Sequence, residues 1–203
     1  MIFAKVNSNF TDLELDKMIQ NYGCHCFPEN SKATIGHGKP VDEIDSTCQK
    51  LNRCRRCISI EFPDEYENLH SDSYRYSINN GEIDCSDPRN SAAHAAMCKC
   101  DKDFAESLAL VWEDSLFNYH YWLNNNNIKI QKSLGSPVFK RENYCTVSFN
   151  ERTNTCCGNE YPVKLPYNSD TKSCCAVGGR AKLYDGSFMD CCADGSVQSI
   201  GSC

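Results

Sequence analysis

The sequence has no run of about 18 apolar residues, so we predict no transmembrane helix. It also lacks an excess of basic residues: 21 Lys and Arg stand against 27 Asp and Glu, a formal net charge of −6. Such a balance opposes binding to nucleic acid and electrostatic docking on anionic lipid. The opening segment MIFAKVNSNF is too short and too polar for the apolar core of a secretory signal. We therefore expect a form of the protein from which a signal has been removed.

What the sequence has in abundance is cysteine. Sixteen of the 203 residues are Cys, an even count, and no Cys/His tract has the character of a zinc site. Such a count in a short chain is typical of a disulfide framework made in an oxidising compartment. We expect a secreted, extracellular protein, in which the sequon Asn9-Phe10-Thr11 makes Asn9 a candidate for glycosylation.

The cysteines divide into two groups of eight. The first group lies among helical patterns and the second lies in a tail without them, which predicts two domains. We place the first domain at 1–123, a linker at 124–144 and a Cys-rich domain at 145–203.

Four elements are predicted in the first half. Thr11–Gln20 reads as a short amphipathic helix, and 42–57 has helical periodicity with Ile44, Cys48 and Leu51 on one face. Asn80-Gly81 is a hairpin signal inside 74–85. Asp87-Pro88 is expected to open a long helix that reaches about Leu123.

In the tail, single cysteines flank three adjacent pairs, and turn dipeptides lie in the intervals: Gly158-Asn159, Gly178-Gly179, Asp185-Gly186 and Asp194-Gly195. We expect short hairpins, each closed by a disulfide and stapled to the next. If neighbours pair, the bridges are Cys145 to Cys156, Cys157 to Cys174, Cys175 to Cys191 and Cys192 to Cys203, although spacing alone does not fix connectivity.

Five segments of the first half together resemble secreted phospholipase A2, and they occur in that family's order: YGCHC (22–26), GKPVDEID (38–45), TCQKLNRC (47–54), YRYSINNGEIDC (74–85) and CKCD (98–101). The resemblance implies a mainly α, disulfide-rich fold. Two long antiparallel helices would be linked by disulfides, with a calcium loop before the first and a small β-wing between them. The implied bridges are Cys26 to Cys48, Cys54 to Cys100, and Cys85 to Cys98. The resemblance leaves two alternatives for the partner of Cys24: it pairs with Cys57, or it pairs with a C-terminal cysteine such as Cys145.

The family's catalytic helix carries Cys-Cys-x-x-His-Asp-x-Cys. The resemblance places Leu51 where the general-base His stands and Asn52 where the calcium-binding Asp stands. A general base and an oxyanion-stabilising ion commonly contribute about 10²-fold to 10⁴-fold each. Leu51 has no proton acceptor, and Asn52 lacks the negative charge that a hard dication favours. We expect no catalytic site.

The calcium loop departs from the family as well. Phe27 and Pro28 stand where the family has a glycine-rich turn whose carbonyls ligate the metal, and the loop is longer. His25 takes the place of a family tyrosine whose backbone carbonyl, not its side chain, is used. We expect no calcium ion and no other cofactor.

Other polar candidates have structural interpretations. Asp101 matches the aspartate that orients the family's imidazole, and here we expect it to accept a hydrogen bond from Asn52, Tyr74 or Tyr76. His94 and Cys98 lie four apart on a helix, but Cys98 has an expected disulfide partner, so zinc is not favoured. Five aromatic residues late in the long helix form either core or an exposed patch facing lipid or a partner: Trp112, Phe117, Tyr119, Tyr121 and Trp122.

The Cys-Cys rhythm of the tail resembles galaxin-like repeats, extracellular arrays found in coral skeletal matrix. We expect a non-enzymatic structural protein of an extracellular matrix, adhesive or mineral-associated. Its partners would be other matrix proteins, further copies of itself, or a mineral or lipid surface. One alternative is a noncatalytic lipid or receptor binder that uses the family's hydrophobic channel. The other is a calcium-dependent phospholipase A2 with residual activity.

Overall fold

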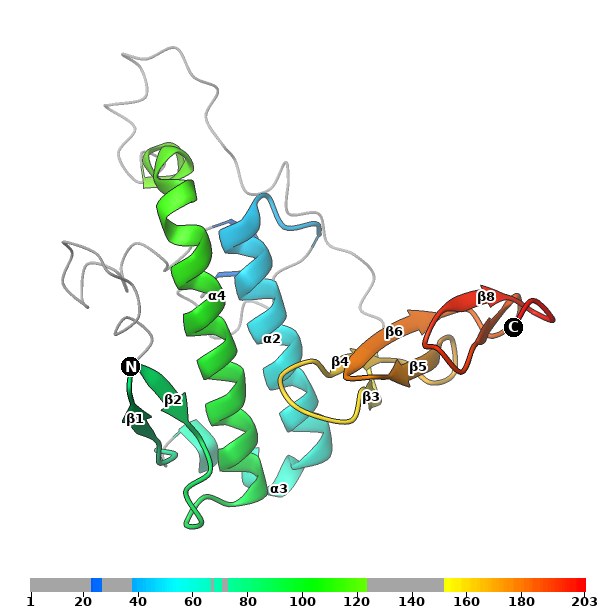
Figure 1. Cartoon of the computed structure of the whole chain (residues 1–203), viewed down its shortest axis with the longest axis horizontal. Coiled ribbons are helices and arrows are strands. Elements are labelled where there is room, and N and C mark those ends of the chain that lie inside the picture. The colour runs from blue at the N-terminus through cyan, green and yellow to red at the C-terminus, as the bar shows by residue number, and fades with distance from the viewer. Residues whose placement is uncertain (1–22, 27–37, 67, 71–72, 124–151) are drawn as a thin grey trace. The chain divides into compact units, whose positions relative to one another are not determined.

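The structure, a computed structural model, describes residues 23–26, 38–66, 68–70, 73–123 and 152–203, without the side chains of 70 and 112–123. The chain divides into two compact units: 1–52 with 104–149, and 53–103 with 150–203. We call them unit 1 and unit 2. Two long helices, α2 (Glu43–Glu61) and α4 (Ala92–Leu123), each contribute a segment to both units (Figure 1). The predicted helix at 11–20 and the predicted linker at 124–144 lie outside the described residues.

Helix α2 begins at a capped N-terminus. The carboxylate of Asp42 accepts a hydrogen bond from the backbone N–H of Asp45 at 2.9 Å, which satisfies one of the donors that a helix start leaves open. The predicted apolar face is confirmed, because Ile44, Cys48 and Leu51 are each at most 2% exposed. Two short helical segments follow, α3 (Pro63–Tyr66) and η2 (Asn68–His70).

The predicted hairpin is also confirmed. Strand β1 (Ser77–Asn79) pairs antiparallel with β2 (Glu82–Asp84). Between them Asn80 and Gly81 have φ values of 51° and 80°, and two consecutive positive values match the tight turn that Asn-Gly favours.

Helix α4 begins later than predicted. Ser91 is the capping residue, since its hydroxyl oxygen accepts from the backbone N–H of His94 at 3.3 Å and its carbonyl from Ala95 at 2.9 Å. Asp87 starts a separate turn, in which its carbonyl accepts from the N–H of Asn90 at 3.0 Å. The prediction that Asp87 caps the helix is therefore wrong.

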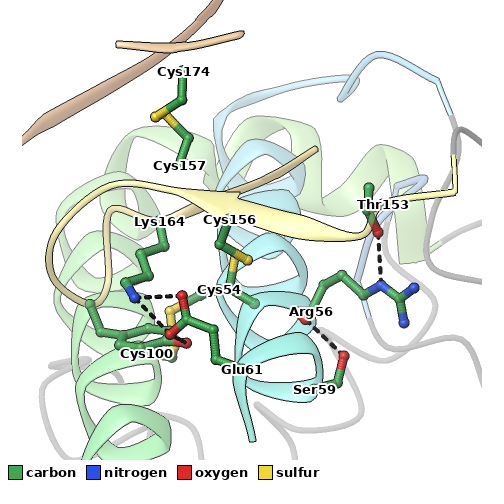
Figure 2. Close-up of a disulfide and its surroundings, with 12 residues drawn as sticks. Cys54, Arg56, Ser59, Glu61, Cys100, Thr153, Cys156, Cys157, Lys164 and Cys174 are labelled. Carbon is green, nitrogen blue, oxygen red and sulfur yellow. Dashed lines mark hydrogen bonds and ion pairs between the residues drawn. A yellow bond between two sulfur atoms is a disulfide. The ribbon is translucent and has the colours of Figure 1, made fainter. Parts of the chain in front are cut away.

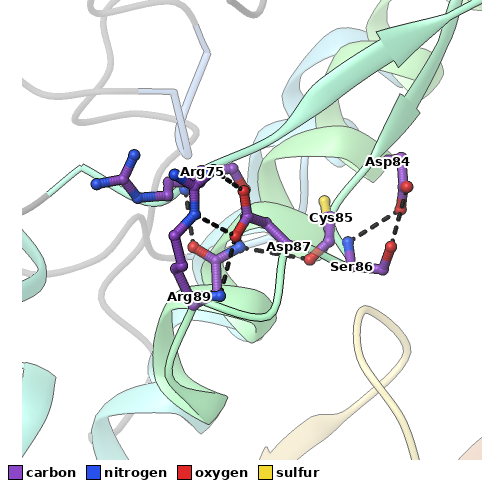
Figure 3. A network of polar contacts seen from close by, with 7 residues as sticks. Arg75, Asp84, Cys85, Ser86, Asp87 and Arg89 are labelled. Carbon is purple, nitrogen blue, oxygen red and sulfur yellow. Dashed lines mark hydrogen bonds and ion pairs between the residues drawn. The ribbon is translucent and has the colours of Figure 1, made fainter.

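The Asp87 carboxylate binds the guanidinium of Arg89 instead, with Nη2 to Oδ2 at 2.6 Å and Nε to Oδ1 at 2.9 Å (Figure 3). These hydrogen bonds hold the pKa of Asp87 below its usual range. Next to this pair, the Asn90 amide bonds both backbone groups of Arg75, at 2.8 Å to the N–H and 2.7 Å to the carbonyl. The chain entering β1 is thus fastened to the start of α4.

Three bridges among the helices and the hairpin are those that the resemblance implied. They join Cys26 to Cys48 in unit 1, and Cys54 to Cys100 and Cys85 to Cys98 in unit 2. The Cys54 bridge ties α2 to α4 within unit 2. Cys24 is also disulfide-bonded, whereas Cys145 lies outside the described residues.

Residues 152–203 of the tail form three antiparallel hairpins, drawn in yellow to red in Figure 1: β3 (Thr155–Cys157) with β4 (Leu165–Tyr167), β5 (Ser173–Val177) with β6 (Arg180–Tyr184), and β7 (Met189–Cys191) with β8 (Val197–Ser199). The predicted Gly178-Gly179 turn joins β5 to β6. Asp185-Gly186 instead connects the second hairpin to the third.

The tail bridges mostly run between hairpins. Cys157 to Cys174 joins the first hairpin to the second, and Cys175 to Cys191 joins the second to the third. Among the bridges between residues 152 and 203, Cys192 to Cys203 alone stays within one hairpin region, the last. These three bridges are the ones predicted, and the expectation that one hairpin is stapled to the next is confirmed. The expectation that each hairpin is closed by its own disulfide is wrong, because adjacent cysteines point to opposite faces of a strand and each member of a pair reaches a different neighbour.

The first hairpin is bonded covalently to α2 through Cys57 and Cys156. This bridge excludes the alternative in which Cys24 pairs with Cys57, and it contradicts the predicted pairing of Cys145 with Cys156. Because spacing within the tail carries no information about the helix surface, the sequence pattern could not identify this partner.

Polar contacts reinforce the junction (Figure 2). Lys164 places its ammonium 2.6 Å from both carboxylate oxygens of Glu61. The Tyr161 hydroxyl donates to the same carboxylate at 2.9 Å. On the other side, Arg56 donates to the Thr153 hydroxyl at 3.0 Å. The first hairpin is thus held to the last two turns of α2 by one covalent and several polar links.

Candidate functional site

Helix α2 presents Leu51 and Asn52 at the two positions that the resemblance singles out. Leu51 is buried, with 2% of its surface exposed, and its side chain carries no atom that could accept or donate a proton. Asn52 is half-buried, and its amide nitrogen donates to the backbone carbonyl of His25 at 2.7 Å. The site at these positions therefore contains an apolar side chain beside an amide that is already engaged.

The segment 23–26 is held to α2 by a buried carboxylate that the sequence reasoning missed. Asp45 is completely buried and accepts hydrogen bonds from the backbone N–H groups of Cys24 at 2.9 Å, His25 at 2.6 Å and Val41 at 3.0 Å. Gly23 has φ of +53°. A Cβ on Gly23 would lie 2.3 Å from the Asp45 carboxyl carbon, so a side chain there cannot be accommodated without a shift.

The His25 ring adds a further contact to this cluster. Its Nε2 lies 3.1 Å from the Gly38 carbonyl and 3.1 Å from the Gln49 amide nitrogen. His25 is 3% exposed, so its imidazole is buried beside α2.

Asp101 has two partners, of which the sequence predicted one. The Tyr74 hydroxyl donates to Oδ2 at 2.8 Å, as expected, and Arg55 forms an ion pair with Oδ1 at 2.8 Å. Asn52 was a wrong candidate because its amide is bonded to His25. Tyr76 packs edge-on against Tyr74, with ring centroids 6.3 Å apart. The sequence contained a clue that Arg55 pairs with Asp101. Arg55 follows Cys54 and Asp101 follows Cys100, so the implied bridge between the two cysteines brings Arg55 and Asp101 together.

These partners leave Asp101 with a structural task. It is 8% exposed and lies between a guanidinium and a phenol, an arrangement that provides a hydrogen bond to each carboxylate oxygen. Burial, and then the negative charge of Asp101, raise the pKa of Tyr74 well above its usual value.

The raised pKa of Tyr74 predicts a loss of stability at alkaline pH. A group whose pKa is higher in the folded state contributes stability below its unfolded pKa of about 10 and loses it as pH rises further. We expect the melting temperature to fall above about pH 10, and Tyr74→Phe to flatten that decline. Thermal melts from pH 8 to 12 measure both slopes; identical slopes for the variant and the wild type would show that Tyr74 ionises as freely in the folded chain as in the unfolded one.

The zinc alternative finds no support in the described geometry. His94 lies 2.8 Å from the Ser91 hydroxyl, and Cys98 is bonded to Cys85. Across the described ranges, no three His, Cys, Asp or Glu side chains gather as a metal ion would require.

Several candidates fall outside the described residues. Asn9 is one, and so are the side chains of the late aromatic set in α4: Trp112, Phe117, Tyr119, Tyr121 and Trp122. Among the helices that the structure describes, none is both long and apolar enough to cross a membrane.

Comparison with known proteins gives one consistent match. A family model described as phospholipase A2 matches residues 1–121. Among curated proteins, the chain is 32% identical over 115 residues to a bovine phospholipase A2 (Bos taurus), covering 52% of this chain and 66% of the relative. It is 36% identical over 106 residues to a mouse group IID secretory phospholipase A2 (Mus musculus), covering 50% and 63%. It is 32% identical over 115 residues to a sheep phospholipase A2 (Ovis aries), covering 52% and 78%. The match thus spans just under two thirds of the bovine and mouse relatives.

Proposed function

Because this chain belongs to the phospholipase A2 family, we propose that it is a non-enzymatic member that serves as a structural protein outside the cell. The observation that carries the proposal is the pair Leu51 and Asn52. Leu51 is buried and Asn52 donates to a backbone carbonyl, and the sequence resemblance assigns these two positions to the family's general base and its acidic neighbour.

The surroundings of Leu51 and Asn52 support the same reading. Ester hydrolysis by activated water needs a proton acceptor within reach of the water. The two carboxylates that the motifs supply are engaged in other contacts: Asp101 with Arg55 and Tyr74, and Asp45 with three backbone N–H groups. We infer that α2 has kept the architecture of a catalytic helix and uses its polar groups to hold the fold.

The tail supports a structural role. Successive hairpins are joined by disulfides, and the first is fastened to α2 by a disulfide and by the Glu61 ion pair. Sixteen cysteines and a family with secretory relatives point to an oxidising, extracellular setting. A covalently braced array is compatible with a load-bearing or adhesive part, and we propose matrix proteins, mineral or further copies of this chain as partners.

The enzymatic question is tested by hydrolysis of phosphatidylcholine vesicles in calcium, beside an active phospholipase A2. We expect no calcium-dependent release of fatty acid above the protein-free blank, since Leu51 supplies no base. Turnover that is blocked by EDTA would overturn the proposal and establish a residual phospholipase.

The structural role is tested separately by sedimentation velocity over a range of protein concentrations, and by a melt with and without the same vesicles. Concentration-dependent assembly without a lipid effect supports a matrix protein. A monomer that is stabilised by vesicles instead identifies a noncatalytic lipid binder and contradicts the structural role.

A further inference from the structure

The carbonyl oxygen of His25 lies between segment 23–26 and helix α2, and a side-chain amide binds it. Asn52 Nδ2 is 2.7 Å from this oxygen, a normal length for a hydrogen bond. A carbonyl oxygen only accepts hydrogen bonds, so the atom of Asn52 that faces it must be the amide nitrogen. The contact joins residues 27 positions apart in the sequence.

A calcium ion, which the family implies, does not fit these atoms. Calcium is held by six to eight oxygen ligands, among them carboxylates and carbonyls. Residue 52 presents an N–H donor rather than an oxygen to the His25 carbonyl. Both oxygens of the neighbouring carboxylate, Asp45, already accept backbone N–H groups, Oδ1 from His25 and Oδ2 from Cys24 and Val41.

We propose that the Asn52 amide replaces a metal ion in this chain: it bridges α2 to the His25 carbonyl and holds segment 23–26 in place without a cation. Asp45 anchors the N–H side of the segment and Asn52 anchors its carbonyl side. Asp45 thus accepts from the N–H groups of the segment and Asn52 donates to a carbonyl of the same segment, so its position does not depend on calcium.

A single atom distinguishes Asn52 from an aspartate that could bind a cation. Asn52→Asp exchanges the donor nitrogen for an oxygen and sets a carboxylate against the His25 carbonyl at hydrogen-bond distance. Two oxygens at that distance repel each other, and a divalent cation that binds both of them from one side offsets the repulsion. The variant should therefore depend on calcium for stability where the parent does not.

The test is the melting temperature of the full chain in EDTA and in 10 mM calcium chloride, an excess chosen as roughly tenfold over a weak millimolar site. The wild type is expected to melt at the same temperature in both. Asn52→Asp should melt lower than the wild type in EDTA and rise by about 3 °C or more in calcium. Asn52→Ala, which removes the donor and adds no charge, should be destabilised equally in both buffers, and sodium chloride at matched ionic strength accounts for screening.

Calcium-dependent stabilisation of the wild type would overturn the proposal, as would an Asn52→Asp variant that calcium does not stabilise beyond the salt control. These readouts are independent of vesicle hydrolysis. The protein can therefore prove inactive in hydrolysis while the proposed metal replacement is contradicted by the melts, or prove active while the melts support the replacement.

Discussion

Asp45→Ala is expected to lower the free energy of unfolding by about 3 to 5 kcal/mol. The carboxylate is completely buried and accepts three backbone N–H groups, from Cys24, His25 and Val41. Each buried donor left without an acceptor costs about 1 to 3 kcal/mol, and hydrogen bonds to a charged group lie at the strong end. Truncation also leaves a cavity between α2 and segment 23–26. Denaturant unfolding followed by near-ultraviolet circular dichroism measures the loss.

Two further variants show whether the Asp45 effect is specific. Asp190→Ala removes an exposed carboxylate from strand β7 and should change stability by no more than about 0.5 kcal/mol. Gly23→Ala approaches the same carboxylate from the other side, with a Cβ that overlaps the Asp45 side chain at a positive φ, and should be clearly destabilising. A loss below about 1 kcal/mol for Asp45→Ala would mean that its three donors find other acceptors.

Removing the bridge between α2 and the first hairpin is expected to cost about 2 to 4 kcal/mol. Cys57→Ser with Cys156→Ser opens a link between residues 99 apart in the sequence. Most of the stabilisation by such a link comes from restricting the unfolded chain, and it increases with the length of the closed loop. Both cysteines are replaced so that neither is left behind as a free thiol. Its midpoint of denaturation, set against the wild type, gives the cost.

The polar part of the same junction should matter much less. Glu61→Gln removes the ion pair to Lys164 and keeps the bridge, and a partly exposed pair of this kind contributes about 1 kcal/mol or less. Hydrogen exchange of the β3 and β4 amides then distinguishes the two effects: we expect faster exchange in the serine double variant and near-native exchange in Glu61→Gln. Equal protection in all three proteins would show that the hairpin is held to α2 by other contacts.

Local features of the fold followed from residues close in the sequence. The turn at Asn80-Gly81 was predictable because both residues tolerate positive φ, and the buried face of α2 because Ile44, Cys48 and Leu51 recur at helical spacing. The start of α4 was not predictable in the same way. Asp87 has the chemistry of a cap, but Arg89 competes for its carboxylate and the helix starts at Ser91.

Disulfide connectivity shows most clearly which features followed from the sequence and which required the tertiary structure. Three pairings within the helical half followed from its resemblance to a family, and three bridges within the tail followed from the assumption that neighbouring cysteines pair. The partner of Cys57 came from neither. Cys156 was expected to close a hairpin with Cys145, and it reaches α2 instead, because a thiol pairs with whichever cysteine the fold brings within bonding distance.

The sequence by itself determined which chemical groups stand on α2: a leucine and an asparagine at the two positions that the resemblance assigns to a base and an acid. It could not determine what those groups do. Only the tertiary structure placed the Asn52 amide against a carbonyl 27 residues away, assigned Asp101 to Arg55, and put three N–H groups around Asp45. Hydrogen bonds and ion pairs act over a few ångströms, and those distances exist only after segments far apart in the chain have packed together.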